Sequence, residues 1–430
     1  MSELISSVVL EAVDTLKRAA ATLPPRPPPV RLLDRLIDFK WHVEEGGNYR
    51  VSPLEFSRRF LGPRRADVIA KRLKRLKPFI IGVDSSSRAV GTAFGAVVVG
   101  AVAVSHPGGI LEWPPIRSNS VEGGPPFVAL VGAEPPTSLE GYLRVVSPGG
   151  DSYVDYSVEQ VLDELRLDLE NWALGGPVRT IVEEAVLRGF QPVVLVDGPV
   201  YPVTMAFQRG PQPGREDYWR SMESLLKARR RAVEGLERLG AIVVGVVKRI
   251  ERSTIISRLA QTLGENMRGL PPGQYGDAHA LYHYYQAIAS QDRLREGRVL
   301  TSIRAEVLFT ALPIGELDKV VEYIVIPPGK WNHYPGAAKY YRTETSPSSN
   351  RALEGHDLRP SYPVVWDSVV RGSLQPISVA AADRVSSGLT RALTSLIARH
   401  TLMTGLPLTY SSEIEMGLHL WRSAGLWASR

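Results

Sequence analysis

The segment FIIGVDSSS, residues 79–87, is a run of apolar β-forming residues that reaches Asp84 and is followed by three serines. The segment PVVLVDG, residues 192–198, reaches Asp197 in the same way. A short apolar run of this kind predicts a buried strand that ends at its aspartate and delivers a carboxylate to the edge of a sheet. Because a helical stretch separates the two segments, we expect neighbouring strands that bring Asp84 and Asp197 together.

Two adjacent carboxylates repel each other unless a cation lies between them. Mg²⁺ and Mn²⁺ prefer oxygen ligands, and the chain has no cysteine, which excludes a zinc–thiolate site, thiolate catalysis and disulfides. Two such ions about 3.5–4 Å apart can stabilise both the attacking and the leaving oxygen of a phosphodiester during cleavage. The leading hypothesis is therefore a nuclease that depends on Mn²⁺ or Mg²⁺, with two ions in its site.

The composition fits a globular protein that binds an anionic partner. The chain has 430 residues, of which 44% are hydrophobic, and a formal net charge of +6. This basic balance is compatible with nucleic acid and also with a small anionic substrate. Arginine greatly outnumbers lysine, which favours a thermophilic source.

The N-terminus predicts an amphipathic helix over residues 1–22. Its apolar residues recur at helical spacing, and acidic residues interrupt them, which excludes the apolar core of a signal peptide. The chain contains no apolar stretch long enough to span a bilayer. We therefore expect a cytoplasmic protein with no membrane partner.

The order of the predicted elements indicates an α/β fold. A proline-rich connector follows the first helix, residues 31–78 are predicted to be helical and charged, and a mixture of strands and helices comes next. The expected core strands cover 79–84, 91–104, 127–132, 141–147, 192–197 and 241–247, with helices at 157–173, 177–189 and 215–238. Antiparallel strands followed by alternating helix and strand predict a ribonuclease H-like mixed sheet flanked by helices, with N- and C-terminal helical extensions.

The C-terminal part of the chain predicts further strands and helices around that core. Strands are expected at 299–310, 319–326, 334–343 and 363–370, and helices at 254–264, 277–290, 377–402 and 411–427. We divide the chain into a helical and proline-rich region (1–78), a ribonuclease H-like catalytic core (79–300) and an α/β extension that completes the core (301–430).

Further acids are candidates for the metal site. Glu183 and Glu184 flank the apolar stripe of the helix before residue 192, and Glu183 is preferred, although two solvated helix acids explain the pattern equally well. Glu170, on the preceding helix, is a weaker candidate. Asp277 begins a predicted helix, where Asp commonly serves as an N-cap, and it is also a candidate for a last catalytic acid.

Two cations follow the predicted strand at 241–247. Lys248 and Arg249 emerge at the edge of the sheet, where a positive charge can neutralise a DNA phosphate. We therefore assign DNA binding to these two residues.

Several of these segments together resemble the NurA nuclease family of archaea and some bacteria. The resemblance is carried by GVDSSS (82–87), the helix at 179–183, LVDG (195–198), GVVKR (245–249) and the later Asp277. It implies a ribonuclease H-like fold and a Mn²⁺-dependent DNA nuclease with 5′-to-3′ exonuclease and single-strand endonuclease activity, acting in end resection at double-strand breaks. It also implies a homodimer that docks on HerA, a hexameric ATP-driven DNA translocase.

The same resemblance assigns roles to individual residues. By the motif match, Asp84, Glu183 and Asp197 bind the metal, and Asp277 is a further catalytic acid. The chain departs from the family pattern after Gly198, where Pro199 replaces the usual serine. It departs again near the C-terminus, where Pro407 is present but the family's aromatic residue and histidine are not in register.

Two other functions compete with the nuclease. An actin-like or sugar-kinase-type ATPase also places an aspartate and a turn after its first strand, although this chain shows no second phosphate loop or adenosine motif. A non-catalytic ribonuclease H-like module that only docks on DNA is the other alternative. Assays for ATP binding and for DNA cleavage with Mn²⁺, Mg²⁺ or EDTA separate these functions.

Overall fold

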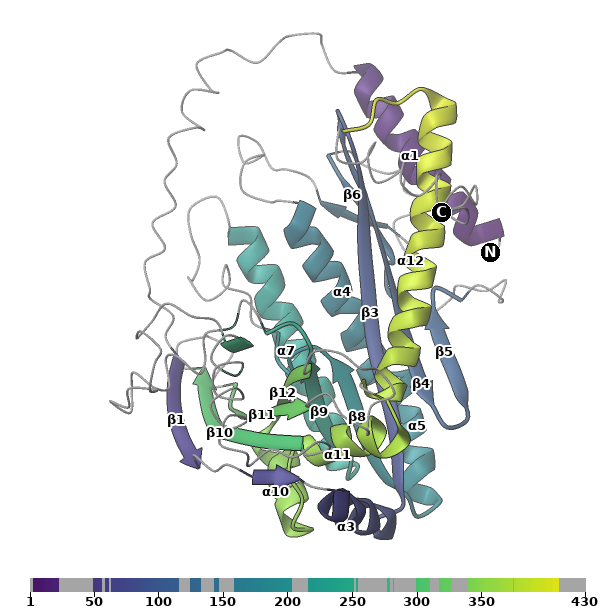
Figure 1. The fold of residues 1–430 in the computed structure, drawn as a ribbon. Coiled ribbons are helices and arrows are strands. Elements are labelled where there is room, and N and C mark those ends of the chain that lie inside the picture. Colours follow the sequence, from purple (N-terminus) through teal and green to yellow (C-terminus); the bar gives the residue numbers. More distant parts are fainter. Residues whose placement is uncertain are drawn as a thin grey trace, which may run out of the picture.

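The computed structural model describes most of the central chain and parts of both ends (Figure 1). The described residues are 3–22, 49–55, 59–61, 63–115, 124–132, 143–146, 158–202, 216–250, 253, 277–278, 281, 299–309, 317–326, 339–373 and 375–409. The expected helices at 254–264 and 411–427, and most of the one at 277–290, lie outside these residues.

The described strands form one mixed sheet in the order β1-β10-β11-β12-β9-β8-β3-β4-β6-β7, with β2 on β10 and β5 on β4. The bounds are β1 (Tyr49–Glu55), β2 (Arg59–Leu61), β3 (Pro78–Thr92), β4 (Gly95–His106), β5 (Gly109–Trp113), β6 (Val128–Val131), β7 (Leu143–Val146), β8 (Gln191–Asp197), β9 (Ile242–Val247), β10 (Val299–Phe309), β11 (Lys319–Ile326) and β12 (Lys339–Thr345). Strands from all three expected regions of the chain therefore belong to a single sheet.

The helices are α1 (Glu3–Thr22), α3 (Pro63–Arg75), α4 (Val158–Gly175), α5 (Pro177–Leu187), α7 (Glu216–Arg238), α10 (Pro347–Gly355), α11 (Ser361–Asp367) and α12 (Ile377–Thr404), with a 3-10 turn η3 at Val369–Arg371. Each predicted core helix is confirmed within a few residues. No helix in the described part of the chain combines the length and apolar character that a membrane crossing requires.

The centre of the sheet has the predicted topology. β3, β4 and β6 are antiparallel neighbours, whereas β8 pairs with β3, and β9 with β8, in parallel. The crossover from β8 to β9 contains α7. This mixed α/β arrangement is the predicted fold class, and its strand order is compatible with a ribonuclease H-like sheet.

Helices pack on both faces of β3. Successive residues of a strand point to opposite faces of the sheet, so neighbouring residues of β3 contact different helices. Asp84 is hydrogen-bonded to α12, whereas Ser85 is hydrogen-bonded to α4. The helix α12 lies along β3 and β4 (Figure 1), and α1 packs on α12. A Cβ added at Gly82 would lie 2.3 Å from the carbonyl carbon of Ser378, so glycine allows α12 to approach the strand closely.

The prediction that the first strand ends at Asp84 is wrong. β3 continues to Thr92, and Ser85 lies opposite Val102 of β4. The serine hydroxyls have partners inside the fold, since Ser85 Oγ donates to Glu170 and Ser87 Oγ donates to the Leu162 carbonyl at 3.0 Å. A serine run can therefore continue a buried strand here instead of forming a turn.

Two further predictions are wrong. Residues 31–78 are not entirely helical, because β1 and β2 lie within them and pair with β10. The expected strand at 363–370 is α11 and the 3-10 turn that follows it. Pro363 lies in the first turn of α11, where a missing N–H costs nothing, and buried contacts on the helix outweigh the β-propensity of its valines.

Candidate metal centre

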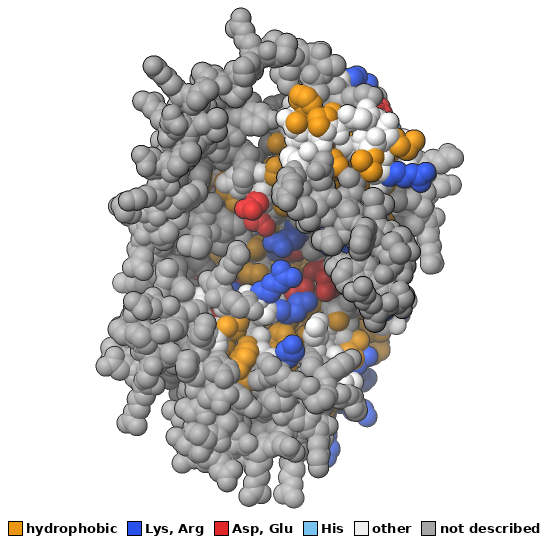
Figure 2. Space-filling model, turned by 45° about the horizontal axis from the view of Figure 1, so that its top comes forward, with side chains coloured by type: hydrophobic (Ala, Val, Ile, Leu, Met, Phe, Trp, Pro, Cys, Tyr) orange, Lys and Arg blue, Asp and Glu red, His pale blue; other side chains and the backbone are white. Residues whose placement is uncertain are grey.

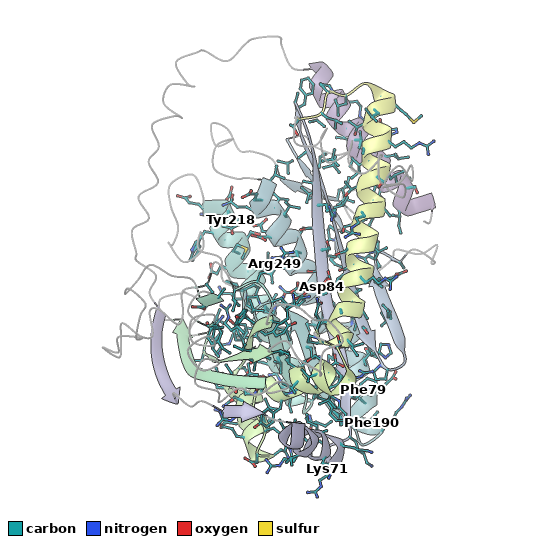
Figure 3. The ribbon with its side chains drawn as sticks, viewed as in Figure 1. Lys71, Phe79, Asp84, Phe190, Tyr218 and Arg249 are labelled. Carbon is teal, nitrogen blue, oxygen red and sulfur yellow. The ribbon has the colours of Figure 1, made fainter. Side chains whose placement is uncertain are left out.

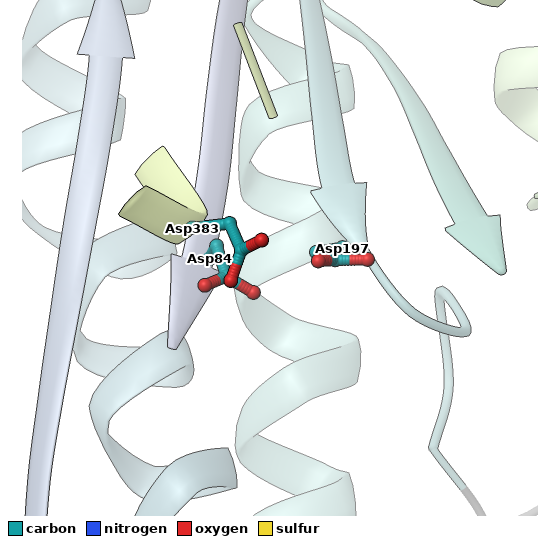
Figure 4. Close-up of side chains that lie close together, drawn as sticks. All are labelled: Asp84, Asp197 and Asp383. Atoms are coloured by element: carbon teal, nitrogen blue, oxygen red, sulfur yellow. The ribbon is translucent and has the colours of Figure 1, made fainter. Parts of the chain in front are cut away.

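Three aspartates from distant parts of the chain converge beside β3 (Figure 4). Asp84, Asp197 and Asp383 each offer one carboxylate oxygen, and these oxygens all lie within 4.8 Å of one another. The parallel register of β3 and β8 pairs Val83 with Val196, which places the next residue of each strand side by side. The third aspartate comes from α12, which packs on β3 and contacts Asp84 through Ser386.

Asp84 is the buried member of this group. Its side chain accepts a hydrogen bond from Ser386 Oγ, 2.5 Å from its Oδ2, and the residue is 6% exposed. Burial raises the pKa of Asp84 to about 8, and the negative charges of Asp197 and Glu170 act in the same direction. Asp84 therefore holds its proton at neutral pH unless a positive charge reaches it.

Asp197 lies at the end of β8 and has a cationic partner. Lys248 Nζ is 2.6 Å from Asp197 Oδ2 and 4.0 Å from Asp383 Oδ2. Burial raises the pKa of Asp197, and the ammonium of Lys248 opposes that shift. Burial, followed by the charge of Asp197, also raises the pKa of Tyr341 on β12.

The loop after Asp197 is held closely against its neighbours. Gly198 has a φ of 118°, a region that glycine adopts without strain. The N–H of Val200 donates to Glu344 Oε2 at 3.3 Å, and Glu344 is fully buried with Lys319 Nζ at 2.8 Å. A Cβ at Gly245 would lie 2.5 Å from the Val200 nitrogen, so β9 and this loop fit together only with glycine there.

The group is accessible from the side of α12. The side chain of Asp383 is 47% exposed, whereas those of Asp197 and Lys248 are 16% and 21% exposed. Acidic and basic side chains lie next to one another in the hollowed middle of the face shown in Figure 2. The site therefore has a buried end at Asp84 and an open end at Asp383.

Glu183 is not among the carboxylates that the structure brings together within its described residues. It lies on α5 with its side chain 44% exposed, and its Oε1 is 3.0 Å from Arg179 Nε one turn earlier. The helical stripe placed Glu183 beside the sheet, but Val182 and Ala185 are the buried residues there.

Of the glutamates considered from the sequence, Glu170 is the one whose charge acts on Asp84. It is 6% exposed, accepts a hydrogen bond from Ser85 Oγ, and pairs with the fully buried guanidinium of Arg229 on α7. Both of its oxygens are engaged in these contacts, on the opposite face of β3 from the three aspartates. Glu170 therefore acts on Asp84 through its negative charge and through its hydrogen bond with the adjacent Ser85.

Asp277 lies in a different buried cluster. It is fully buried and accepts a hydrogen bond from Tyr323 Oη, and its N–H donates to the Ser253 carbonyl at 2.6 Å. Arg342 contacts the same cluster through its bond to Ser253 Oγ at 2.5 Å. The structure does not bring Asp277 into the group of three aspartates.

Arg249 follows Lys248 directly and is exposed, so the two predicted DNA contacts differ in their surroundings (Figure 3). Lys248 faces the carboxylates, whereas Arg249 faces solvent.

Sequence reasoning missed Asp383. The available signal was weak, because a single acid on a long helix is an ordinary solvated residue, and only the contact of α12 with β3 gives it a role.

The donor set of this group fits a hard divalent cation. It consists of three carboxylates, with no sulfur or imidazole ligand in the cluster, and oxygen ligands of this kind suit Mn²⁺ or Mg²⁺. Burial raises the pKa of Asp84, and the negative charge of Asp197 raises it further. A cation would relieve that repulsion.

Solved structures similar to this chain are those of NurA proteins. The crystal structure of the NurA nuclease from Sulfolobus solfataricus is 10% identical, with a TM-score of 0.38, and the match covers 88% of this chain and 98% of that one. A crystal structure of NurA with manganese is 10% identical, with a TM-score of 0.40, and the match covers 78% of this chain and 96% of that one. No curated protein matches the chain.

A sequence model of the NurA domain matches residues 79–326, which is more than half of the chain. The matched region contains Asp84, Asp197 and Lys248, and it ends before α12 and Asp383. The chain belongs to the NurA domain family.

Proposed function

We propose that this protein is a metal-dependent nuclease that hydrolyses phosphodiester bonds of DNA beside Asp84, Asp197 and Asp383. The observation that carries the proposal is the convergence of these three carboxylates from β3, β8 and α12. Membership of the NurA domain family supports the same activity.

In this proposal the three aspartates hold Mn²⁺ or Mg²⁺, two ions in the full site. When bound, the metal supplies positive charge that stabilises the phosphoryl group as the bond to the leaving oxygen breaks. Asp84 must lose its proton before it can act as a ligand, so metal binding releases a proton. Ser386 holds Asp84 in place through its hydrogen bond.

Lys248 and Arg249 are proposed to contact phosphates of the DNA. Lys248 lies between two of the carboxylates, where its ammonium can reach the phosphate that is cleaved. The Lys248→Gln variant should bind DNA more weakly. The slope of its log affinity against log salt should be flatter by the amount that about one phosphate contact contributes. Lys227→Gln is a matched control, because Lys227 is a half-exposed lysine paired with Glu223 on α7. Equal salt dependence in both variants would argue against a phosphate contact at Lys248.

The finer activity follows the family resemblance. We propose 5′-to-3′ exonuclease and single-strand endonuclease activity in end resection at double-strand breaks, carried out in the cytoplasm by a homodimer that works with a HerA-type translocase. These assignments concern digestion polarity and partners, which assays on the purified protein address directly.

The test is cleavage of single-stranded and duplex DNA labelled at either end, with Mn²⁺, Mg²⁺ or EDTA. We expect degradation with Mn²⁺ that EDTA abolishes, and products that show removal from the 5′ end. Asp84→Ala and Asp197→Ala should each abolish degradation while the fold persists. Full activity in either variant would refute the site, and ATP hydrolysis without DNA cleavage would favour the ATPase alternative.

A further inference from the structure

The helix α12 presents arginines to solvent next to the three aspartates. We propose that the arginine face of α12, formed by Arg384, Arg391 and Arg399, is a phosphate-binding track that guides a DNA strand to the three aspartates. This inference rests on the proposed nuclease function and adds the surface that holds the substrate outside the site.

The three arginines share one side of the helix. At 3.6 residues per turn they lie within about 80° of one another around the helix axis. All three are exposed, whereas Ser386, Leu393 and Ile397 on the other side are buried. The burial of that side against β3, β4 and α1 fixes the direction in which the arginines point.

Among the described residues, no acid forms an ion pair with an arginine of this face. Between Arg384 and Thr404 the sequence contains no aspartate or glutamate. Several arginines on other helices pair with an acid one turn away, as Arg188 does with Glu184 and Arg230 with Glu234. Within the described residues, the acid of α1 that reaches α12 pairs with His400, at 2.9 Å between Asp14 Oδ1 and Nε2. The guanidinium groups of the arginine face are therefore available for an external anion.

The track begins at the site and continues away from it. Arg384 directly follows Asp383, and Arg399 lies about 22 Å further along the helix at 1.5 Å per residue. At the spacing of phosphates along one strand of a duplex, this length spans about six nucleotides. The helix surface is open at Gly388, between Arg384 and Arg391, where a Cβ would meet no atom within 4 Å. A nucleic-acid backbone can therefore approach the helix closely at this point.

An acidic protein surface is the other partner that such a face could bind. The position of the first arginine beside Asp383 favours DNA, because a strand cleaved at the carboxylates must leave the site along its open end, and Asp383 forms that end. The guanidinium of arginine can also donate two parallel hydrogen bonds to one phosphate, so a row of arginines suits a nucleic-acid backbone.

The test compares two triple variants that each remove three positive charges. Arg384→Gln, Arg391→Gln and Arg399→Gln are combined in one protein, and Lys71→Gln, Lys74→Gln and Arg75→Gln in the control. The control residues are exposed on α3, at the foot of the molecule and far from Asp84 (Figure 3). Binding of fluorescent single-stranded and duplex oligonucleotides is measured by anisotropy in EDTA, between about 50 and 200 mM salt, the range over which counterion release is read.

We expect the α12 variant to flatten the slope of log affinity against log salt by about 2 for a single strand and about 2.7 for a duplex. A reduction confined to one of the two substrates identifies which form of DNA the track holds. The control should keep the slope of the wild type. A third variant with lysine at 384, 391 and 399 should also keep that slope, because lysine preserves the charge.

Equal effects of the α12 variant and the α3 control would overturn the track and indicate a general effect of net charge. Unchanged DNA binding in the α12 variant would overturn it too, while leaving the nuclease function intact if the wild type still binds and cuts. A wild-type protein that neither binds nor cuts DNA would instead overturn the proposed function itself.

Discussion

Ser386 of α12 donates a hydrogen bond to Asp84 of β3, with 2.5 Å between Oγ and Oδ2, although the two residues lie 302 positions apart in the chain. The helix α12 therefore belongs to the same candidate site as Asp84 of β3. This helix lies beyond the region matched by the NurA domain, and it also supplies Asp383 and the arginine face.

Asp383 should contribute to metal binding. The Asp383→Asn variant removes one of the three converging charges, so Mn²⁺ affinity should fall by about tenfold or more, as expected for loss of a charged ligand. Calorimetric titration with Mn²⁺ measures this directly. Asp357→Asn is the control, because Asp357 is an exposed aspartate paired with Arg72 on the surface. Equal affinities in both variants would remove Asp383 from the site.

Glu170 and Glu183 should differ in their effects. Glu170→Gln weakens the hydrogen bond from Ser85, the neighbour of Asp84, and the pairing with buried Arg229, so Mn²⁺-dependent cleavage should fall by about tenfold or more. Glu183→Gln breaks only an exposed helix pair, worth less than about 1 kcal/mol, and should leave cleavage within about twofold. The reverse ranking in a cleavage assay would restore Glu183 as the metal ligand that the sequence suggested.

The stability of the metal-free protein should fall as pH rises. The pKa of Asp84 is about 8 in the folded protein and 3.8 in the unfolded reference, so the folded state binds the proton more tightly. The stabilisation is complete below about pH 4 and is lost towards pH 8, by at most about 1.4 kcal/mol per pH unit. Urea denaturation in EDTA at several pH values measures this, and Asp84→Asn should flatten the dependence. The raised pKa would be contradicted if the unfolding free energy of the wild type rose between pH 5 and 8 and that of Asp84→Asn rose with the same slope.

The buried pair of Arg229 and Glu170 should be worth more than a surface pair. Arg229→Met leaves the Glu170 carboxylate buried without its cation, which should cost about 3–5 kcal/mol of unfolding free energy. Arg230→Met removes a half-exposed partner of Glu234 and should cost less than about 1 kcal/mol. The double variant of Arg229→Met and Glu170→Met should recover much of the loss. Additive losses in the double variant would show that the two side chains stabilise the fold independently.

The sequence was sufficient for the centre of the fold and for two of the three aspartates. The runs that form β8 and β9 are apolar throughout because both faces of these strands are buried, and such runs are recognisable without any tertiary information. The aspartate at the end of β8 was placed beside Asp84 by the parallel register alone. These are local properties of the chain together with one rule of sheet topology.

The rest depended on tertiary contacts. The serines after Asp84 have a turn-like composition, and only their bonds to α4 residues keep them in a strand. The valines of α11 favour a strand by propensity, but Asp367 accepts bonds from Ser378 N at 2.8 Å and Ser378 Oγ at 2.6 Å, which hold the helix against the start of α12. The positions of Asp383 beside Asp84 and of Glu170 beside Ser85 likewise result from packing between residues far apart in the chain.

The most direct test is a crystal structure of the protein grown or soaked with Mn²⁺, in which anomalous scattering locates the ion. The account predicts an anomalous peak within coordination distance of carboxylate oxygens of both Asp84 and Asp197, with Asp383 in the same coordination shell or one water away. A structure in which Mn²⁺ binds elsewhere, or in which Asp84 and Asp197 contact no ion at saturating Mn²⁺, would contradict it.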